Sequence, residues 1–282
     1  MKQNDDSRDR IQRAAVERFG AQLTIEPGWS GLDELACMME HRSHRKYSGR
    51  AVEPGLLRLL FACALSAPSK SDLQQADIVH VADRAIIKAI AGGIPDMPWI
   101  ADAPVFLVFL ANNRRIRQIG EWRGKPFVND HLDHFMNAAV DAGLVMMNFI
   151  RSAEAVGLGA CPISAVRNHP GEVSRLLGLP DQVFPVAGLC VGYPAEAGRI
   201  TPRLSLEVTV HTDRYNETRM KEKIDAYDRR RDELLPYRRQ RNSERFGKAD
   251  FYGWSEDKAR QYCVPERADF GVFIRSKGFS LK

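Results

Sequence analysis

The chain has 282 residues, and 44% of them are hydrophobic, which is enough for the core of one large domain or two smaller ones. The formal net charge is +5. Residues 199–282 carry 20 Lys and Arg against 14 Asp and Glu, a difference of +6, which leaves −1 for the rest of the chain. Basic and acidic residues alternate in this last part, as in solvated helices, so we expect no nucleic-acid partner. No apolar run approaches the roughly 20 residues of a membrane-spanning helix, so we expect no membrane partner.

The first half of the chain predicts three helices and two strands. Residues 1–20 show helical spacing of apolar side chains, residues 32–40 form a short amphipathic pattern, and residues 54–67 are apolar almost all round and stop at Pro68. Residues 76–82 and 103–111 are rich in β-branched and aromatic side chains, which predicts strands.

The second half predicts four helices and two further strands. Residues 114–130 are polar and irregular, and we expect a mobile loop there. Helices are expected at 131–156, 170–177, from just after Tyr215 to about Leu235, and at 267–277, with strands at 184–191 and 206–211. The organisation expected from these elements is a mixed α/β core over residues 31–215, an N-terminal helical arm over 1–30 and a C-terminal helical extension with a loop over 216–282.

Five cysteines are scattered along the chain, and no two form a C-x-x-C pair. An odd number without such a pair favours reduced thiols over disulfides or a metal centre. The first ten residues, MKQNDDSRDR, are polar and unlike a secretory signal. We therefore expect a cytoplasmic protein.

Two segments far apart in sequence each carry arginine in a pattern that suits one anion. Arg42 and Arg45 flank hydroxyl and imidazole groups, and Arg203 follows a proline far along the chain. Forked cationic donors with hydroxyls suit a phosphate, and no glycine-rich phosphate loop is present to bind one instead. Taken singly, Arg42 and Arg45 would more often be surface cations at the C-terminal end of a helix.

A metal site has one weak candidate. His131 and His134 can share one helix face and have Asp133 between them, but no third ligand follows at a convincing spacing. We expect polar residues at the start of a long helix and no metal.

Several short motifs follow one another in an order known from one family. They are Arg-Ser-x-Arg at 42–45, Ala-Pro-Ser-x-Ser-x-x-Gln at 67–74, Gly-Leu-Gly at 157–159, Gly-Leu-Pro at 178–180, Gly-x-Cys-x-Gly-Tyr-Pro at 188–194 and Pro-Arg-Leu at 202–204. From about residue 32 to 279 the chain resembles the nitroreductase family of FMN-dependent oxidoreductases. Within it, the resemblance is to the branch of the major oxygen-insensitive nitroreductases and NADPH–flavin oxidoreductases.

The resemblance implies a fold, a cofactor and its ligands. The fold implied is α+β, with a mostly antiparallel central sheet flanked by helices, in an interlocked homodimer that holds FMN at its interface. The positions that match the FMN-binding segments of the family are His41, Arg42, Ser43, Arg45, Ser69, Ser71, Gln74, Pro162, Ile163, Ser164, Thr201 and Arg203. The chain departs from many relatives at Thr201, where they have lysine, and at Ser164 and Ala165, where they have glycine.

The activity implied is that of an NAD(P)H-dependent FMN oxidoreductase that reduces nitroaromatics, quinones or flavins by a two-electron, ping-pong mechanism. The flavin performs the chemistry, so no catalytic side chain is expected. Alternatives are a specialised flavin reductase or a reductive dehalogenase of the same family, or a flavin-binding protein that does not turn over.

The donor expected is NADPH rather than NADH. Residues 237–245 read YRRQRNSER, and the resemblance matches Arg239, Arg241 and Arg245 to a loop that contacts NADPH, with Arg267 as a further arginine on the nucleotide side. Arginine forks are the usual readers of the 2′-phosphate. From the residues alone, a solvated basic loop is the favoured interpretation of this stretch.

Overall fold

The computed structural model describes residues 2–26 and 28–282, so Met1 and Pro27, both in the predicted N-terminal arm, lie outside the described residues. By its internal contacts the chain divides into two units. The first unit comprises Met1–Arg42 and Arg199–Glu266, and the second comprises Ser43–Gly198 and Arg267–Lys282. The division at residues 30 and 215 that the sequence predicts stays a prediction.

The second unit is built on a four-stranded antiparallel sheet. Its strands are β1 (Ala76–Val81), β2 (Val105–Asn112), β3 (Gly159–Ile163) and β4 (Val183–Gly192), in the order β1-β2-β4-β3. The predicted strands at 76–82, 103–111 and 184–191 are therefore confirmed, whereas β3 was not predicted as a strand. The expectation of a mixed fold with a central antiparallel sheet is also confirmed.

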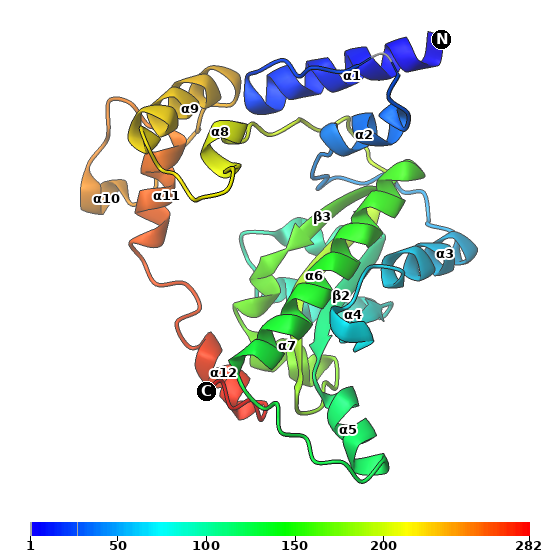
Figure 1. Cartoon of the computed structure of the whole chain (residues 1–282). Coiled ribbons are helices and arrows are strands. Elements are labelled where there is room, and N and C mark those ends of the chain that lie inside the picture. Colours follow the sequence, from blue (N-terminus) through cyan, green and yellow to red (C-terminus); the bar gives the residue numbers. More distant parts are fainter. Residues whose placement is uncertain (1, 27) are drawn as a thin grey trace. The chain divides into compact units, whose positions relative to one another are not determined.

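Helices cover both faces of this sheet (Figure 1). On one face, Leu107 and Phe109 of β2 pack against α3 (Pro54–Leu65) and α6 (Leu132–Ala155). On the other, Phe106 and Val108 pack with α4 (Arg84–Gly92) and α7 (Pro170–Leu176). Successive side chains of a strand point to opposite faces, so a strand between two helical layers has to be apolar throughout. This is why β2 reads as a continuous run, VFLVFLA.

The remaining elements of the second unit are short. They are the 3₁₀ turns η1 (Lys70–Asp72), η2 (Pro98–Asp102) and η3 (Ser164–Arg167), and the helices α5 (Arg114–Trp122) and α12 (Phe270–Ser276). The prediction of an irregular loop over 114–130 is wrong for its first half, which is α5. The side chain of Asn112 accepts hydrogen bonds from the backbone N–H groups of Arg114 and Arg115, both at 3.0 Å, and so caps the first turn.

The first unit is helical. It contains α1 (Lys2–Phe19), α2 (Leu32–Met39), α8 (Leu206–Thr209), α9 (Met220–Leu234), α10 (Ser243–Phe246) and α11 (Trp254–Tyr262). The predicted strand at 206–211 is wrong, because residues 206–209 form α8. The alternating pattern Leu-Glu-Val-Thr-Val finds no sheet to join, since the strands of the described residues all lie in the second unit. Within the described residues, no helix combines the length and the apolar character needed to cross a membrane.

Candidate functional site

The outer edge of β3 carries one group of predicted site residues. Ser43 bridges Ala160 of β3, and the backbone N–H of His44 donates to the carbonyl of Ala160 at 3.0 Å. This approach requires glycine at 159, because a Cβ there would lie 2.7 Å from Cγ of His44. The segment 43–47 is thereby held along β3. Arg45 is exposed, and its guanidinium lies 6.0 Å from the ring centroid of Trp99.

The side chains of β3 and η3 divide between the core and the surface. Cys161 and Ile163 are buried, whereas Pro162 and Ser164 are exposed. Arg267 adds a cation here, because its Nη1 donates to the carbonyl of Ser164 at 3.4 Å. Of the predicted flavin contacts, Pro162 and Ser164 can therefore offer side chains to a ligand, while the side chain of Ile163 belongs to the core.

Two buried cysteines lie in this region and belong to its structural support. Cys161 and Cys190 face each other across β3 and β4. Burial raises the pKa of the Cys161 thiol and that of the Cys190 thiol, which keeps both protonated at neutral pH. The hydroxyl of Tyr47 bonds to the carbonyls of His44 at 2.6 Å and Cys190 at 3.1 Å, so this cluster supports the 43–47 segment structurally.

A second group of predicted site residues lies in the loop that leads into β1. The hydroxyl of Ser69 donates to Asp141 at 2.6 Å and accepts from the backbone N–H of Gln74 at 2.8 Å. Ser71 and Gln74 have φ angles of 51° in the left-handed region, which is uncommon outside glycine. Strained backbone of this kind persists where the surroundings hold it, and it gathers at ligand-binding loops.

Asp141, on α6, holds this loop in place. Its carboxylate is 2% exposed and accepts from the Ser69 hydroxyl, from the backbone N–H of Lys70 at 3.1 Å and from that of Gln75 at 3.4 Å. A buried carboxylate is stable only with such donors, so the loop and α6 depend on each other. Sequence reasoning missed Asp141, because nothing along the chain links it to residues about 70 positions earlier.

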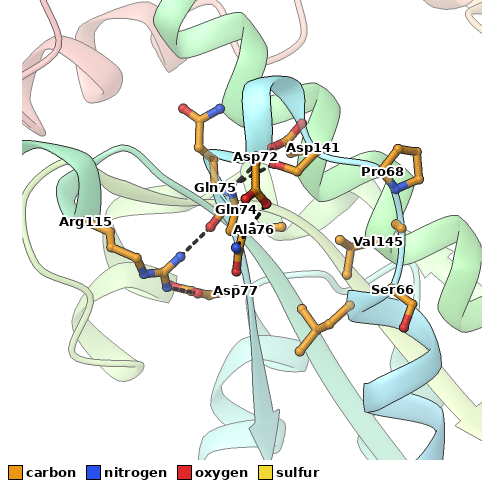
Figure 2. A pocket seen from close by; sticks show the side chains of 13 residues that line it. Ser66, Pro68, Asp72, Gln74, Gln75, Ala76, Asp77, Arg115, Asp141 and Val145 are labelled. Atoms are coloured by element: carbon orange, nitrogen blue, oxygen red, sulfur yellow. Dashed lines mark hydrogen bonds and ion pairs between the residues drawn. The ribbon is translucent and has the colours of Figure 1, made fainter. Parts of the chain in front are cut away.

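The loop and α6 border a cavity of about 610 Å³ (Figure 2). Ser69, Gln74, Asp141 and Arg115 are among its lining residues, and Arg115 also pairs with Asp77. Gln75 lines it as well, and its side-chain amide is buried with neither Nε2 nor Oε1 paired within the described residues. Ser71 does not line the cavity. Gln75 is a second candidate that the sequence did not single out.

The two groups lie at opposite edges of one sheet. Residues 69–75 precede β1, the first strand in the order, whereas Ser43, Arg45 and Pro162 lie on or beside β3, the last. Three strand spacings separate the edges, about 14 Å at the usual spacing. One copy of the second unit therefore does not bring these predicted residues together.

The first unit carries the remaining predicted flavin ligands. The guanidinium of Arg18, on α1, donates to the carbonyl of His41 at 2.7 Å and to that of Thr201 at 3.3 Å. His41 and Arg42 are thus joined to the segment that carries Thr201 and Arg203. The side chain of Arg203 is exposed. Arg18 is a third residue that sequence reasoning missed.

The predicted NADPH arginines are divided between the units. Arg239 and Arg241 line a cavity of about 500 Å³ in the first unit, together with Tyr237 and Asp257. Nε of Arg241 lies 3.2 Å from Asp257, and burial raises the pKa of Tyr237 to about 12. Arg245 is not among the residues that line this cavity, and its guanidinium lies 5.0 Å from the ring centroid of Phe246. Arg267 belongs to the second unit.

The histidine pair considered for a metal is split by burial. His134 is buried, its ring lies 4.9 Å from that of Phe127, and desolvation lowers its pKa. His131 is exposed at the start of α6. The described residues contain no group of three His, Cys, Asp or Glu side chains that could hold a metal ion.

We predict that Asp141→Asn lowers the free energy of unfolding by about 1–3 kcal/mol. The NH₂ group of the asparagine side chain is a donor, and it would point at the donors of the loop that the carboxylate now accepts from. Chemical denaturation measures this free energy. The matched control is Asp133→Asn, an exposed carboxylate on the same helix that bonds Asn137, and it should change the free energy by less than about 0.5 kcal/mol. Equal effects from both variants would contradict the role of Asp141.

Comparison with known proteins identifies the family of this chain. The family model described as "Nitroreductase family" matches residues 38–193, and that of the "Nitroreductase family, C-terminal domain" matches residues 201–282. An FMN reductase [NAD(P)H] of Bacillus subtilis is 34% identical over 251 residues, which cover 88% of this chain and 98% of that protein.

Solved structures agree with this result. NfrA2 of B. megaterium superposes with a TM-score of 0.80 at 32% identity, covering 88% of this chain and 98% of that one. The NADPH:FMN oxidoreductase from Vibrio harveyi complexed with NAD+ gives 0.78 at 26% identity, covering 88% and 99%. With family matches over both of its parts and a relative at this identity along nearly its whole length, the chain belongs to the nitroreductase family.

Proposed function

We propose that this protein is an NAD(P)H-dependent FMN oxidoreductase that reduces nitroaromatics, quinones or flavins in two-electron steps. The observation that carries the proposal is the loop before β1. There a strained backbone, a buried carboxylate and the unpaired amide of Gln75 border a cavity. The names of its relatives, an FMN reductase and an NADPH:FMN oxidoreductase, support the same activity.

The residues present fit FMN chemically. An isoalloxazine ring offers carbonyl acceptors and an N–H donor, which would satisfy both unpaired atoms of the Gln75 amide. A phosphate needs charge-assisted donors, and Arg45 and Arg203 both expose theirs. Ser43 and Ser71 add hydroxyls for the ribityl chain, and Ser69, whose proton is donated to Asp141, could still accept from it. Pro162 and Ser164 form the exposed strip along which the cofactor would pack.

FMN, when bound, supplies the two-electron chemistry, accepting electrons from NAD(P)H and passing them to the second substrate in turn. The chain's own residues then have three tasks: to hold the phosphate, to orient the ring and to admit two substrates one after the other. We assign no side chain an acid or base role. The buried, protonated cysteines described above fit this assignment.

We propose a homodimer on two grounds. The predicted flavin residues at the β1 and β3 edges are separated within one copy, so one complete site needs edges from two copies. In addition, α6 exposes an apolar stripe at a spacing of three or four residues, made of Leu132, Met136, Val140, Leu144 and Met147. An apolar helix face of this length normally packs against another surface.

For the compartment we propose the cytoplasm, where exposed thiols such as Cys263 stay reduced.

Three other functions compete with this proposal. A specialised flavin reductase or reductive dehalogenase would share the cofactor site and differ in its oxidant. A flavin-binding protein without turnover would keep the site and lack access for a nucleotide. The first test below separates turnover from storage, and a panel of nitroaromatic, quinone, flavin and halogenated oxidants separates the enzymes.

The purified protein should be yellow, lose its absorption near 450 nm when NADPH is added without oxygen, and regain it when a quinone follows. Stopped-flow absorption measures both half-reactions. Bleaching without recovery by any oxidant of the panel, or colour that neither NADPH nor NADH bleaches, would contradict the proposed activity. A colourless protein that binds neither FMN nor riboflavin would contradict the cofactor.

Sedimentation should give a particle of twice the 31.8 kDa of one chain. Met136→Lys, at a position 60% exposed on α6, should shift the equilibrium towards the monomer and lower FMN content, because a charge would replace apolar contact. Val272→Lys on α12, at a position 67% exposed, is the matched control outside the stripe and should leave the dimer intact. A folded monomer carrying a full load of FMN would contradict the dimer.

We further propose NADPH as the preferred donor. Arg241→Ala and Arg267→Ala should each raise the KM for NADPH about tenfold and leave that for NADH and the FMN content nearly unchanged, since one charge-assisted bond to the 2′-phosphate is worth roughly 1.5–3 kcal/mol. The control is Arg229→Ala, an exposed arginine of α9. Equal use of NADPH and NADH by the unaltered enzyme would rule out this preference and leave the flavin proposal standing.

A further inference from the structure

The helix α1 precedes the part of the chain that the family models match, since the first match begins at residue 38. We propose that Arg18 of this helix is a positioning residue for the FMN phosphate, because it ties together the two backbone segments that carry Arg42 and Arg203. The inference rests on the proposed function, and it assigns a role in cofactor binding to an element outside those matches.

The guanidinium of Arg18 is the first part of this connection. The residue is 7% exposed, and its Nε and Nη2 donate to the carbonyl of Met39 at 3.1 and 3.0 Å. Nη2 also donates to the carbonyl of His41 at 2.7 Å, and Nη1 to that of Thr201 at 3.3 Å. A planar fork can join carbonyls from two segments in this way, whereas a lysine ammonium is a single point.

The backbone of Arg18 is the second part. Its carbonyl accepts from the backbone N–H of Arg203 at 2.6 Å and from Nη2 of Arg230 at 3.1 Å. Arg230 also donates to the carbonyl of Arg203 at 2.7 Å, and the hydroxyl of Tyr227 donates to that of Pro202 at 3.1 Å. Every carbonyl from Thr201 to Arg203 therefore has a donor, and Arg18 contacts the segment at both of its ends.

The helix that carries Arg18 is itself anchored. Arg10 forms an ion pair with Glu40 at 2.6 Å, and Ile11 packs with Leu32 and Ala36 of α2. The turn after α1 is close-packed as well, because a Cβ at Gly20 would lie 2.6 Å from Cδ of Arg230. The position of Arg18 is thus set by packing on two sides.

These contacts act on FMN through backbone order. Arg18 is bonded to carbonyls, so its task is to hold others in place: His41 directly precedes Arg42, and Thr201 lies two residues before Arg203. Holding both segments before the ligand arrives removes part of the entropy cost of binding. Without Arg18, the backbone before Arg42 and Arg203 would lose these contacts, and binding of the phosphate would have to supply more of its order. The affinity for FMN should then fall, while that for riboflavin, which has no phosphate, should change little.

The test compares dissociation constants for FMN and riboflavin, measured by flavin fluorescence with the full-length apoprotein. Arg18→Met should weaken FMN binding about tenfold or more and riboflavin binding by less than about twofold, as expected for the loss of several buried hydrogen bonds. Arg18→Lys should weaken FMN binding roughly threefold. Arg203→Ala provides the reference for direct loss of a phosphate ligand. Arg13→Met, an exposed arginine of the same helix, is the matched control and should match the unaltered protein.

The ratio of the two constants decides the outcome. A general loss of structure would weaken both flavins together, so an unchanged FMN-to-riboflavin ratio in Arg18→Met and Arg18→Lys overturns the inference. Should both variants fail to fold, Tyr227→Phe removes a single bond to the Pro202 carbonyl and should lower the same ratio about twofold. An unaltered ratio in Tyr227→Phe would then overturn it. If the unaltered protein binds no FMN, or shows no preference for it over riboflavin, the result contradicts the proposed cofactor site. The role inferred for Arg18 is then contradicted as well.

Discussion

The structure of the second unit depends on the burial of β2 on both faces. Its side chains pack into two separate cores, one with α3 and α6 and the other with α4 and α7, and the strand lies inside the sheet, between β1 and β4. In the strand order β1-β2-β4-β3, the strands β1 and β3 form the two edges of the sheet. The loops attached to those edges hold the two groups of candidate flavin ligands, so the constraint that builds the core also separates the halves of the site. The proposed homodimer follows from this separation.

Buried charges bonded to backbone groups hold the candidate binding segments in shape. Asp141 accepts from the loop before β1, and Arg18 donates to carbonyls just before the arginines at 42 and 203. In both cases a charge taken out of water is stabilised by several partners, and removing it would leave those partners unpaired. Neither side chain needs to touch a cofactor. Each holds in place a backbone segment whose other residues would contact the cofactor. Substitution of Asp141 or Arg18 should therefore affect binding.

Much of the candidate site was accessible from the sequence because its motifs are local. Ser69 and Gln74 stand within one short loop, and Arg42, Ser43 and Arg45 stand within four residues, so their order along the chain is itself the signal. The sequence did not reveal Asp141, Gln75 and Arg18, because their roles depend on distant residues or on burial. The hydroxyl that Asp141 accepts from belongs to Ser69, 72 residues earlier, and Arg18 reaches Thr201, 183 residues later. No spacing rule links such pairs, and an unpaired amide is recognisable only once burial is known.

The sequence by itself determined the elements whose residues are stable only in a buried core, which are the strands around Phe106 and Leu189 and the long apolar helix α6. It also determined the family and the cofactor chemistry of that family. Tertiary structure alone decided the rest. Residues 206–209 alternate like a strand, yet form α8 because no sheet edge is available in their unit, and residues 114–122 form α5 once Asn112 caps their first turn. The pattern of apolar and polar residues in a segment shows in which surroundings that segment can be stable. Which surroundings it receives depends on partners brought near by the folding of distant parts of the chain.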